Sequence, residues 1–361
     1  MFSEIQKIKY QNLSAYTNLK ANFNQKLIQN MSLSIYFKSL FILLIVSFLI
    51  SCTKSDQPLQ QYEHAVEGAF TAEISQNGDY SVISSIHHGL SLWDNRNNKL
   101  LFQWQHHNAQ DNDIYIVRIS ANNSHALTAS RSEFAIWDIK TGQSVGFYKV
   151  SESPIRDIQL SANGRYVLYG QVNGKVVHID LQTGRRLEMP IHTEKINSVD
   201  LSANGLYALS GGNDHKAFLW NTKTAQIIQE FAFNHRVSMV KFEDQGRYAF
   251  IADTQKASQI WDLTTGKLQS TLIYTARQSI FSSVRFINEG KQLLTGNGTK
   301  TITLWDVKTG LSQQSWTVTP RKETRPKTAV VYSATLWDGD KIASESSAGF
   351  LEIWPLDALK N

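Results

Sequence analysis

The sequence predicts an all-β fold in which seven copies of a four-stranded unit close into a β-propeller. Three series of short motifs, recurring in step, support this prediction. The first is Trp-Asp or a close variant, found at Trp93-Asp94, Trp137-Asp138, Ile179-Asp180, Trp220-Asn221, Trp261-Asp262, Trp305-Asp306 and Trp354-Pro355. Successive copies are 44, 42, 41, 41, 44 and 49 residues apart. Regular repeats of this length are typical of propeller blades.

The other two series are turn motifs that flank each tryptophan. Upstream of the tryptophans lie SQNG (75–78), SANN (120–123), SANG (161–164), SANG (202–205), EDQG (243–246), INEG (287–290) and WDGD (337–340). Downstream lie IKTG (139–142), LQTG (181–184), TKTA (222–225), LTTG (263–266) and VKTG (307–310). Asn-Gly and Thr-Gly supply the positive φ that tight hairpin turns require, so strands should flank each motif.

The fourth unit illustrates how each repeat divides into strands. Its alternating and β-branched segments predict strands at 196–201, 206–210, 217–220 and 227–231, separated by turns.

The two ends of the repeat region together supply the strands of one blade. Too few residues follow Trp354 for a fourth strand, whereas a spare segment, 59–66, precedes the first inner strand at 69–74. We therefore expect the N-terminal segment to complete the last blade.

The repeat length and the Trp-Asp dipeptide resemble the WD-repeat family, over residues 60–356. That resemblance implies a structural hydrogen-bonded tetrad in the fourth unit: His192, Ser210, Asp214 and Trp220. Other units depart from the pattern, with Ile179 in place of a tryptophan and Thr299 in place of an aspartate. A Ser-His-Asp set also suggests nucleophilic catalysis, but groups that satisfy one another inside a blade are the stronger interpretation.

A candidate partner-binding ring lies at the second position of each predicted innermost strand. Its members are Phe70, Tyr115, Arg156, Asn197, Ser238, Ser282 and Tyr332. In WD-repeat proteins, residues near this point reach the top face, where partners often dock. Because aromatic residues and arginine are enriched at protein interfaces, Phe70, Tyr115, Arg156 and Tyr332 are the candidate contacts. The alternative is that the aromatics only fill the inner ends of the blades.

Other chemistries receive little support. His87-His88 and His106-His107 lack a third ligand at a recognisable spacing, so we interpret them as solvated or loop histidines and expect no metal. The sequence has no phosphate-binding glycine loop and no nucleophile elbow, so we expect no cofactor and no enzymatic activity. The loop at 320–327 carries four cations that could meet anionic lipid or an acidic partner, although solvation alone explains most such loops.

The N-terminal segment predicts a lipid anchor. An apolar run at 40–50, too short for the roughly 20 residues of a membrane-spanning helix, precedes Cys52, the only cysteine of the chain. Leu49-Ile50-Ser51-Cys52 resembles the lipobox of bacterial lipoprotein precursors, which implies acylation of Cys52 and removal of residues 1–51. Met31 is a better start than Met1, because it gives a leader of ordinary length. The alternatives are an ordinary cysteine after a signal or anchor helix, and a long n-region.

Removing the leader leaves 31 basic and 30 acidic residues, so the basic pI belongs largely to the leader and does not indicate nucleic-acid binding. We thus expect residues 52–58 to be a lipidated tether and residues 59–361 a monomeric propeller. Its expected location is the bacterial cell envelope, where Thr53 after the cysteine favours the outer membrane, facing the periplasm. Its expected role is to bind unidentified envelope proteins. The alternatives are an envelope enzyme with a site in the channel, and an accessory lipoprotein of an outer-membrane assembly complex.

Overall fold

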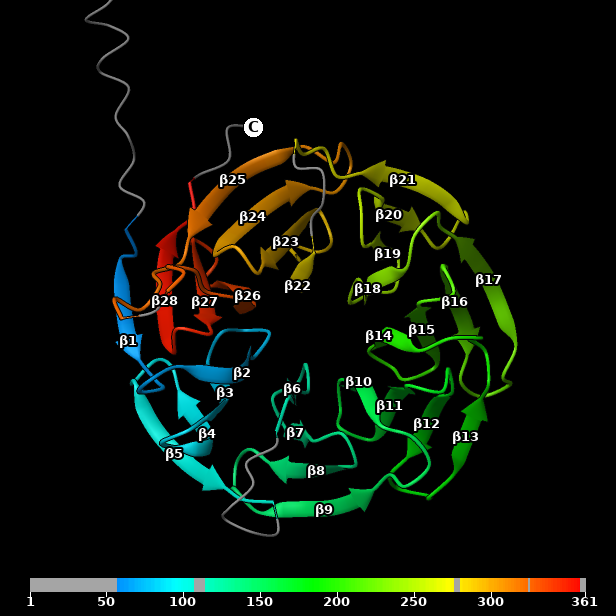
Figure 1. Ribbon diagram of the computed structural model, residues 1–361, viewed down its shortest axis with the longest axis horizontal. Coiled ribbons are helices and arrows are strands. Elements are labelled where there is room, and N and C mark those ends of the chain that lie inside the picture. The colour runs from blue at the N-terminus through cyan, green and yellow to red at the C-terminus, as the bar shows by residue number, and fades with distance from the viewer. Residues whose placement is uncertain (1–56, 107–113, 276–279, 324, 358–361) are drawn as a thin grey trace, which may run out of the picture. The chain divides into compact units, whose positions relative to one another are not determined.

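The structure is a computed structural model and describes residues 57–106, 114–275, 280–323 and 325–357. These residues form seven four-stranded antiparallel sheets around a central axis, which confirms the predicted propeller (Figure 1). Residues 57–361 constitute one compact unit. The described part of the chain contains no helix, and so none long and apolar enough to cross a membrane.

Each blade has four strands, which are grouped here by their distance from the axis. The innermost strands are β2 (Ala69–Ile74), β6 (Ile116–Ile119), β10 (Ile155–Leu160), β14 (Ile196–Leu201), β18 (Val237–Phe242), β22 (Phe281–Ile287) and β26 (Val331–Trp337). The second strands are β3 (Tyr80–Ser85), β7 (His125–Ala129), β11 (Tyr166–Gln171), β15 (Tyr207–Gly212), β19 (Tyr248–Asp253), β23 (Gln292–Asn297) and β27 (Lys341–Ser346). The third strands are β4 (Gly89–Asp94), β8 (Glu133–Asp138), β12 (Val176–Asp180), β16 (Lys216–Asn221), β20 (Ser258–Asp262), β24 (Thr301–Asp306) and β28 (Phe350–Pro355). The outermost strands are β5 (Lys99–Trp104), β9 (Ser144–Lys149), β13 (Arg186–Met189), β17 (Ile227–Ala232), β21 (Lys267–Thr271), β25 (Ser312–Thr317) and β1 (Gln60–Glu63).

We call the face on which the innermost strands begin the top face, and the opposite one the bottom face. The blades are numbered from β2 in chain order, so blade 7 contains β26, β27, β28 and β1. The four strands expected in the fourth unit correspond to β14–β17, with ends that differ from the prediction by two residues at most.

The Ser-x-Asn-Gly motif forms the turn between the first and second strands through its own side chains. In blade 4, Ser202 Oγ donates to Asn204 Oδ1 at 2.8 Å and accepts from Tyr207 N at 2.9 Å. Gly205 has φ of 73°, and a Cβ there would lie 2.2 Å from a ring carbon of Tyr166 in blade 3. Glycine is thus required both for the left-handed backbone and for the close approach of the neighbouring blade.

The aspartate of the Trp-Asp motif organises the turn between the third and fourth strands. Asp138 Oδ1 accepts from the backbone N of Thr141 at 2.7 Å and from its hydroxyl at 2.9 Å. These bonds, led by the backbone one, hold the pKa of Asp138 below its ordinary value. Asp306 and Thr309 repeat the arrangement in blade 6. The repeated dipeptide is therefore explained by a local turn that recurs in successive blades.

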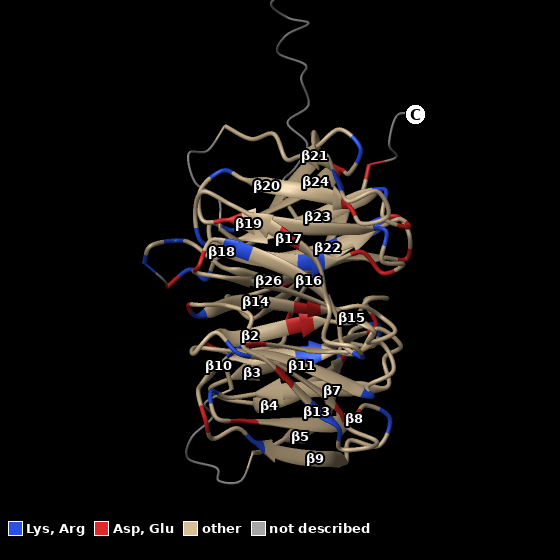
Figure 2. Cartoon of the chain, turned by 90° about the vertical axis from the view of Figure 1, so that its right-hand side faces the viewer, with Lys and Arg blue, Asp and Glu red and all other residues tan. Residues whose placement is uncertain are grey.

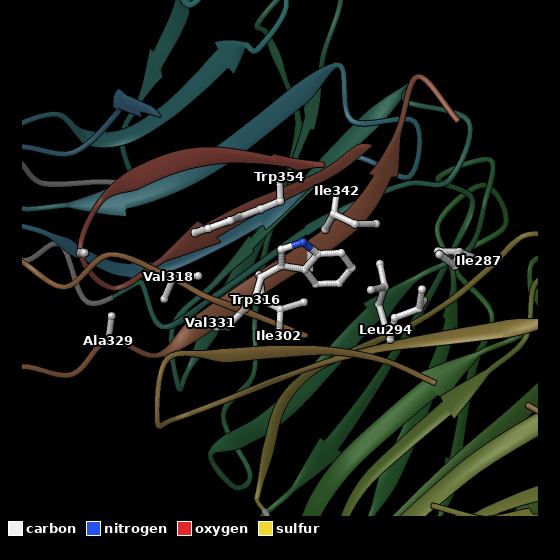
Figure 3. Close-up of a cluster of buried hydrophobic side chains, with 12 residues drawn as sticks. Ile287, Leu294, Ile302, Trp316, Val318, Ala329, Val331, Ile342 and Trp354 are labelled. Carbon is white, nitrogen blue, oxygen red and sulfur yellow. The ribbon is translucent and has the colours of Figure 1, made fainter. Parts of the chain in front are cut away.

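The hydrophobic core is divided among the contacts between neighbouring blades. Figure 3 shows one such cluster, in which Trp316 of blade 6 lies among aliphatic side chains and Trp354 of blade 7. Ile302 of blade 6 and Val331 of blade 7 are fully buried there. Each blade buries one face against each neighbour, so a missing blade would expose apolar surface on both sides of the gap.

The N-terminal segment closes the ring, as predicted. Strand β1 pairs antiparallel with β28, with Gln60 opposite Ile353 and Glu63 opposite Phe350. His64 follows β1 and is fully buried, with Nδ1 at 2.7 Å from Glu345 Oε1 of blade 7. The same imidazole stacks on Trp93 of blade 1, with ring centroids 4.5 Å apart. His64 therefore joins the last blade to the first.

The 320–327 loop contributes to the same closure, which corrects the interpretation of a merely solvated loop. Arg321 Nη2 lies 2.7 Å from Glu63 Oε1 and also donates to the carbonyl of Ala65. Its guanidinium lies 5.1 Å from the centroid of the Phe350 ring. Lys322, Arg325 and Lys327 are exposed, so only part of the loop's charge faces solvent.

The predicted leader, Met31 and Cys52 lie outside the described residues, as do residues 53–56 of the predicted tether.

Candidate functional site

A central cavity of about 410 Å³ is lined by residues from all seven blades. Every member of the predicted ring contributes to this lining. In six blades, all except blade 2, the ring residue stands at a shift in register between the first and second strands, as Arg156 does between Ile155 and Asp157. A β-bulge places two residues opposite one and can re-aim a side chain. The bulge explains why successive blades present the same position to the cavity.

The ring is asymmetric, because only three consecutive blades present exposed side chains of interface type. Phe70 is 46% exposed and Tyr115 is 52% exposed, and Arg156 is also exposed. The guanidinium of Arg131 lies 5.6 Å from the centroid of the Tyr115 ring. Blades 1 to 3 therefore combine two exposed aromatic rings with two arginines at the mouth of the cavity.

Tyr332 in blade 7 does not have this character. Its side chain is half-buried, and its hydroxyl donates to the carbonyl of Ala69 in blade 1 at 3.3 Å. Burial raises the pKa of this phenol above its ordinary value. Tyr332 thus links blade 7 to blade 1. This favours the alternative interpretation for Tyr332, in which the aromatic side chain fills the inner end of its blade.

The ring residues of blades 4 to 6 also bind backbone. Asn197 donates to the carbonyl of Val237 in the next blade at 2.8 Å, and Ser282 donates to that of Val331 at 2.7 Å. Ser238 donates to a carbonyl of its own blade, that of Asp253, at 3.1 Å. Asn197 and Ser282 therefore join neighbouring blades, and Ser238 bonds within its own blade.

Below the mouth, charged side chains of the innermost strands form ion pairs across blade boundaries. Arg118 Nη2 lies 2.8 Å from Asp157 Oδ1, and Lys241 Nζ lies 3.0 Å from Asp200 Oδ1. Arg285 of blade 6 pairs with Glu73 of blade 1 and so passes across blade 7.

None of these ion-paired residues was predicted from the sequence. A signal existed, because they occupy the third or fifth position of an innermost strand, and alternate side chains of a strand share one face.

The bottom end of the cavity is narrowed by a contact between two turns. Gln76 Nε2 of blade 1 donates to Asp244 Oδ2 of blade 5. Desolvation by the surrounding protein raises the pKa of Asp244 above its ordinary value, although Arg285 and Lys241 oppose that effect. The cavity therefore has a cationic and aromatic top mouth and an acidic bottom end.

The four tetrad residues implied by the resemblance come together in blade 4, but only three are hydrogen-bonded to one another. His192 Nδ1 lies 3.0 Å from both carboxylate oxygens of Asp214, and Nε2 lies 2.9 Å from Ser210 Oγ. Trp220 Nε1 is buried without a hydrogen-bond partner among the described residues. The Phe218 ring packs edge-on against His192, 5.0 Å between centroids, beside this tryptophan. Because His192 and Ser210 are buried, the set is inaccessible to a substrate and acts in the packing of the blade.

Blade 2 contains the complete relay. His106 lies in the segment after β5, as the loop interpretation expected, but its side chain is only 8% exposed, so the interpretation as a solvated histidine is wrong. His106 Nε2 lies 2.7 Å from Thr128 Oγ1, and Nδ1 lies 2.9 Å from Glu133 Oε1. Trp137 Nε1 donates to the same threonine hydroxyl at 2.8 Å. His106 therefore corresponds to His192, with a glutamate in place of the aspartate. His107 lies outside the described residues.

His87 and His88 behave differently from one another. His87 is 48% exposed, with Nε2 at 3.1 Å from Glu67, whereas His88 packs edge-on against Trp93. No group of three or more His, Cys, Asp or Glu side chains within the described ranges could hold a metal ion.

Basic and acidic residues are interspersed on both faces of the described propeller in the side view of Figure 2.

Comparisons with known proteins agree with this architecture. Residues 185–221 match the WD40 family model, described as WD domain, G-beta repeat. This stretch contains the tetrad of blade 4. Over 117 residues, 31% of the chain, the sequence is 26% identical to WD repeat-containing protein SL1-17 of Schistosoma mansoni. The matched stretch spans 37% of that relative's length. The protein is thus a seven-bladed propeller with a WD40 repeat, an architecture typical of protein-interaction scaffolds.

Proposed function

We propose that this propeller is a platform that binds a partner protein on its top face, over blades 1 to 3. The observation that carries the proposal is the asymmetry of the ring around the cavity. Phe70, Tyr115 and Arg156 are exposed on consecutive blades, whereas ring residues of the other blades bind backbone. A surface with exposed aromatic rings and an arginine provides the side chains that most often dominate binding energy.

The same proposal includes a place for the protein, which is lipid-anchored through Cys52 in a bacterial envelope and faces the periplasm. Its support is the lipobox-like Leu49-Ile50-Ser51-Cys52 after a short apolar run. Thr53 favours the outer membrane, and the partner is then another envelope protein. Metabolic labelling with a palmitate analogue, followed by fractionation of membranes, tests the anchor. We expect label and membrane association in the native chain and the loss of both in Cys52→Ala; a labelled Cys52→Ala chain would contradict the anchor.

An enzyme with a channel site is the rival function, and Asp244 is the observation in its favour, because its pKa is raised inside a cavity. Binding without catalysis is better supported. Most other charged groups of the cavity neutralise one another between blades, as in the Arg118–Asp157 and Lys241–Asp200 pairs. We therefore expect Asp244→Asn to leave partner capture unchanged. Loss of an activity in this variant with capture intact would favour the enzyme.

The decisive experiment is crosslinking in cells of the tagged full chain, followed by purification from membranes and mass spectrometry. Phe70→Ala/Tyr115→Ala is the test variant. Ile227→Ala/Ile228→Ala is the matched control, because these side chains are 47% and 50% exposed on the outer strand of blade 4. We expect a stoichiometric partner with the native chain and the control, and at least a tenfold loss with the test variant. A partner retained by the test variant would contradict the proposed surface, and a β-barrel protein as partner would favour the assembly accessory.

A further inference from the structure

Most basic side chains of the cavity lining form ion pairs with carboxylates of the same lining. The basic side chains of the described lining are Arg118, Arg156, Lys241 and Arg285. Three of them form the ion pairs between blades described above, and each of these also uses carboxylates of the lining. Arg156 alone among them has no ion pair within the described chain. Its charge is therefore uncompensated by the described residues at the top mouth of the cavity.

The neutralised carboxylate nearest to Arg156 in the sequence, that of Asp157, has both oxygens engaged and does not turn toward Arg156. Asp157, the next residue, accepts from Arg118 and from the backbone N of Ile158 through Oδ1, and from Val199 N at 2.9 Å through Oδ2. The bulge at Arg156 separates the two neighbours by aiming Arg156 at the mouth while Asp157 bridges blades 2, 3 and 4.

The side chains around the cavity mouth favour a ligand that carries apolar groups as well as a negative charge. Phe70 and Tyr115, the ring residues of the two preceding blades, are both exposed and line the same cavity. A ligand that fits must therefore carry apolar groups beside its negative charge. At the other end, the carboxylate of Asp244 opposes deeper entry of an anion.

We propose that the top mouth binds an extended acidic segment of the partner, in which an Asp or Glu side chain has an apolar residue next to it. The carboxylate accepts from the guanidinium of Arg156, and the apolar side chain packs on Phe70 and Tyr115. A cavity of about 410 Å³ admits one or two side chains and excludes a folded element. This inference rests on the proposed function, because it names the partner chemistry recognised at the same surface.

The test is selection of peptides from a random twelve-residue library displayed on phage, with the detergent-solubilised full chain as target. The test variant is Arg156→Glu and the control is Arg236→Glu. Arg236 is also exposed and directly precedes an innermost strand, but it does not line the cavity. We expect the native chain and the control to enrich peptides that share an acidic residue beside an apolar one, and Arg156→Glu to lose them.

Synthetic peptides then isolate the carboxylate. Replacement of the shared Glu by Gln should weaken binding by about tenfold to a hundredfold, the range of one charge-assisted hydrogen bond. Arg156→Lys should recover part of this binding, and added salt should weaken it. The acidic side chain, and not a chain end, is the ligand if C-terminally amidated peptides bind equally well.

The outcomes separate this inference from the proposed function. The carboxylate inference is wrong if the selected peptides lack acidic residues or bind Arg156→Glu as well as the native chain. The binding surface is still supported in that case if the same peptides fail to bind Phe70→Ala/Tyr115→Ala. If the native chain enriches no peptide, recognition of an extended segment is wrong, while crosslinking still decides the platform. Enrichment of basic peptides would overturn the inference outright.

Discussion

Ring closure through His64 gives the sharpest prediction about stability. The imidazole and the carboxylate of Glu345 have no exposed surface, and their closest atoms are 2.7 Å apart. Glu345 Oε2 is buried without a hydrogen-bond partner among the described residues. His64→Ala would therefore leave a buried carboxylate with neither of its oxygens bonded, and would also remove the ring that stacks on Trp93.

Leaving a buried acidic side chain without its hydrogen-bond partner costs about 3–5 kcal/mol. For a unit of residues 57–361, the average unfolding entropy per residue converts this loss into a fall in Tm of about 5–8 °C. His87→Ala is the matched control, because His87 is 48% exposed and its partner Glu67 is 65% exposed. Its effect should stay within about 0.5 kcal/mol.

Differential scanning calorimetry of the full chain, with a check for two-state unfolding, provides the measurement. Glu345→Gln in the His64→Ala background should recover part of the lost stability, because it removes the uncompensated charge. A fall in Tm of less than about 2 °C for His64→Ala, or no recovery in the double variant, would refute the closing role of this pair.

Three further predictions concern the blades. Asp157→Ala removes the acceptor of Arg118 and of two backbone N–H groups. Chemical denaturation should therefore show a free energy of unfolding lower by about 3–5 kcal/mol, and a decrease below about 1 kcal/mol would contradict the bridging role of Asp157. Trp137→Phe deletes an indole N–H that donates to Thr128, whereas Trp220→Phe deletes an indole N–H that has no partner among the described residues. The free energy of unfolding should therefore fall by about 1–2 kcal/mol more in Trp137→Phe than in Trp220→Phe. Equal losses in the two variants would contradict this distinction. Burial, with a smaller contribution from a nearby arginine, lowers the pKa of His178 to about 4 from an ordinary value of 6.5, so the folded state binds fewer protons than the unfolded state between these values. Stability should then fall by about 2–3 kcal/mol from this group as pH decreases from 7 to 4.5, and His178→Leu should flatten that dependence in denaturation curves at both pH values.

Much of the fold could be predicted because its determinants are local. Asp138 and Thr141 build their turn within four residues, and Ser202, Asn204 and Gly205 build another, so spaced motifs in the sequence report the blades directly. The pairing of the N-terminal strand with the last blade followed from a deficit at one end of the chain and a surplus at the other.

The candidate site was only partly accessible in this way. The ring positions were found because one register recurs in every repeat, yet equal register did not mean equal role. Tyr332 and Asn197 bind backbone of the neighbouring blade, whereas Phe70 and Arg156 are exposed. What separates them is the position of the adjacent blade, which no motif within a repeat encodes.

The sequence by itself determined the repeat, the number of blades and the ring positions at the cavity mouth, since turn chemistry and strand alternation act over a few residues. Only the tertiary structure decided which groups meet across blades. His106 was misread because its partners lie 22 and 27 residues away, and Arg285 pairs with Glu73 across 212 residues. Such contacts arise when the ring closes and brings distant strands to one axis, and among the basic side chains of the described cavity lining they leave only Arg156 without an ion pair.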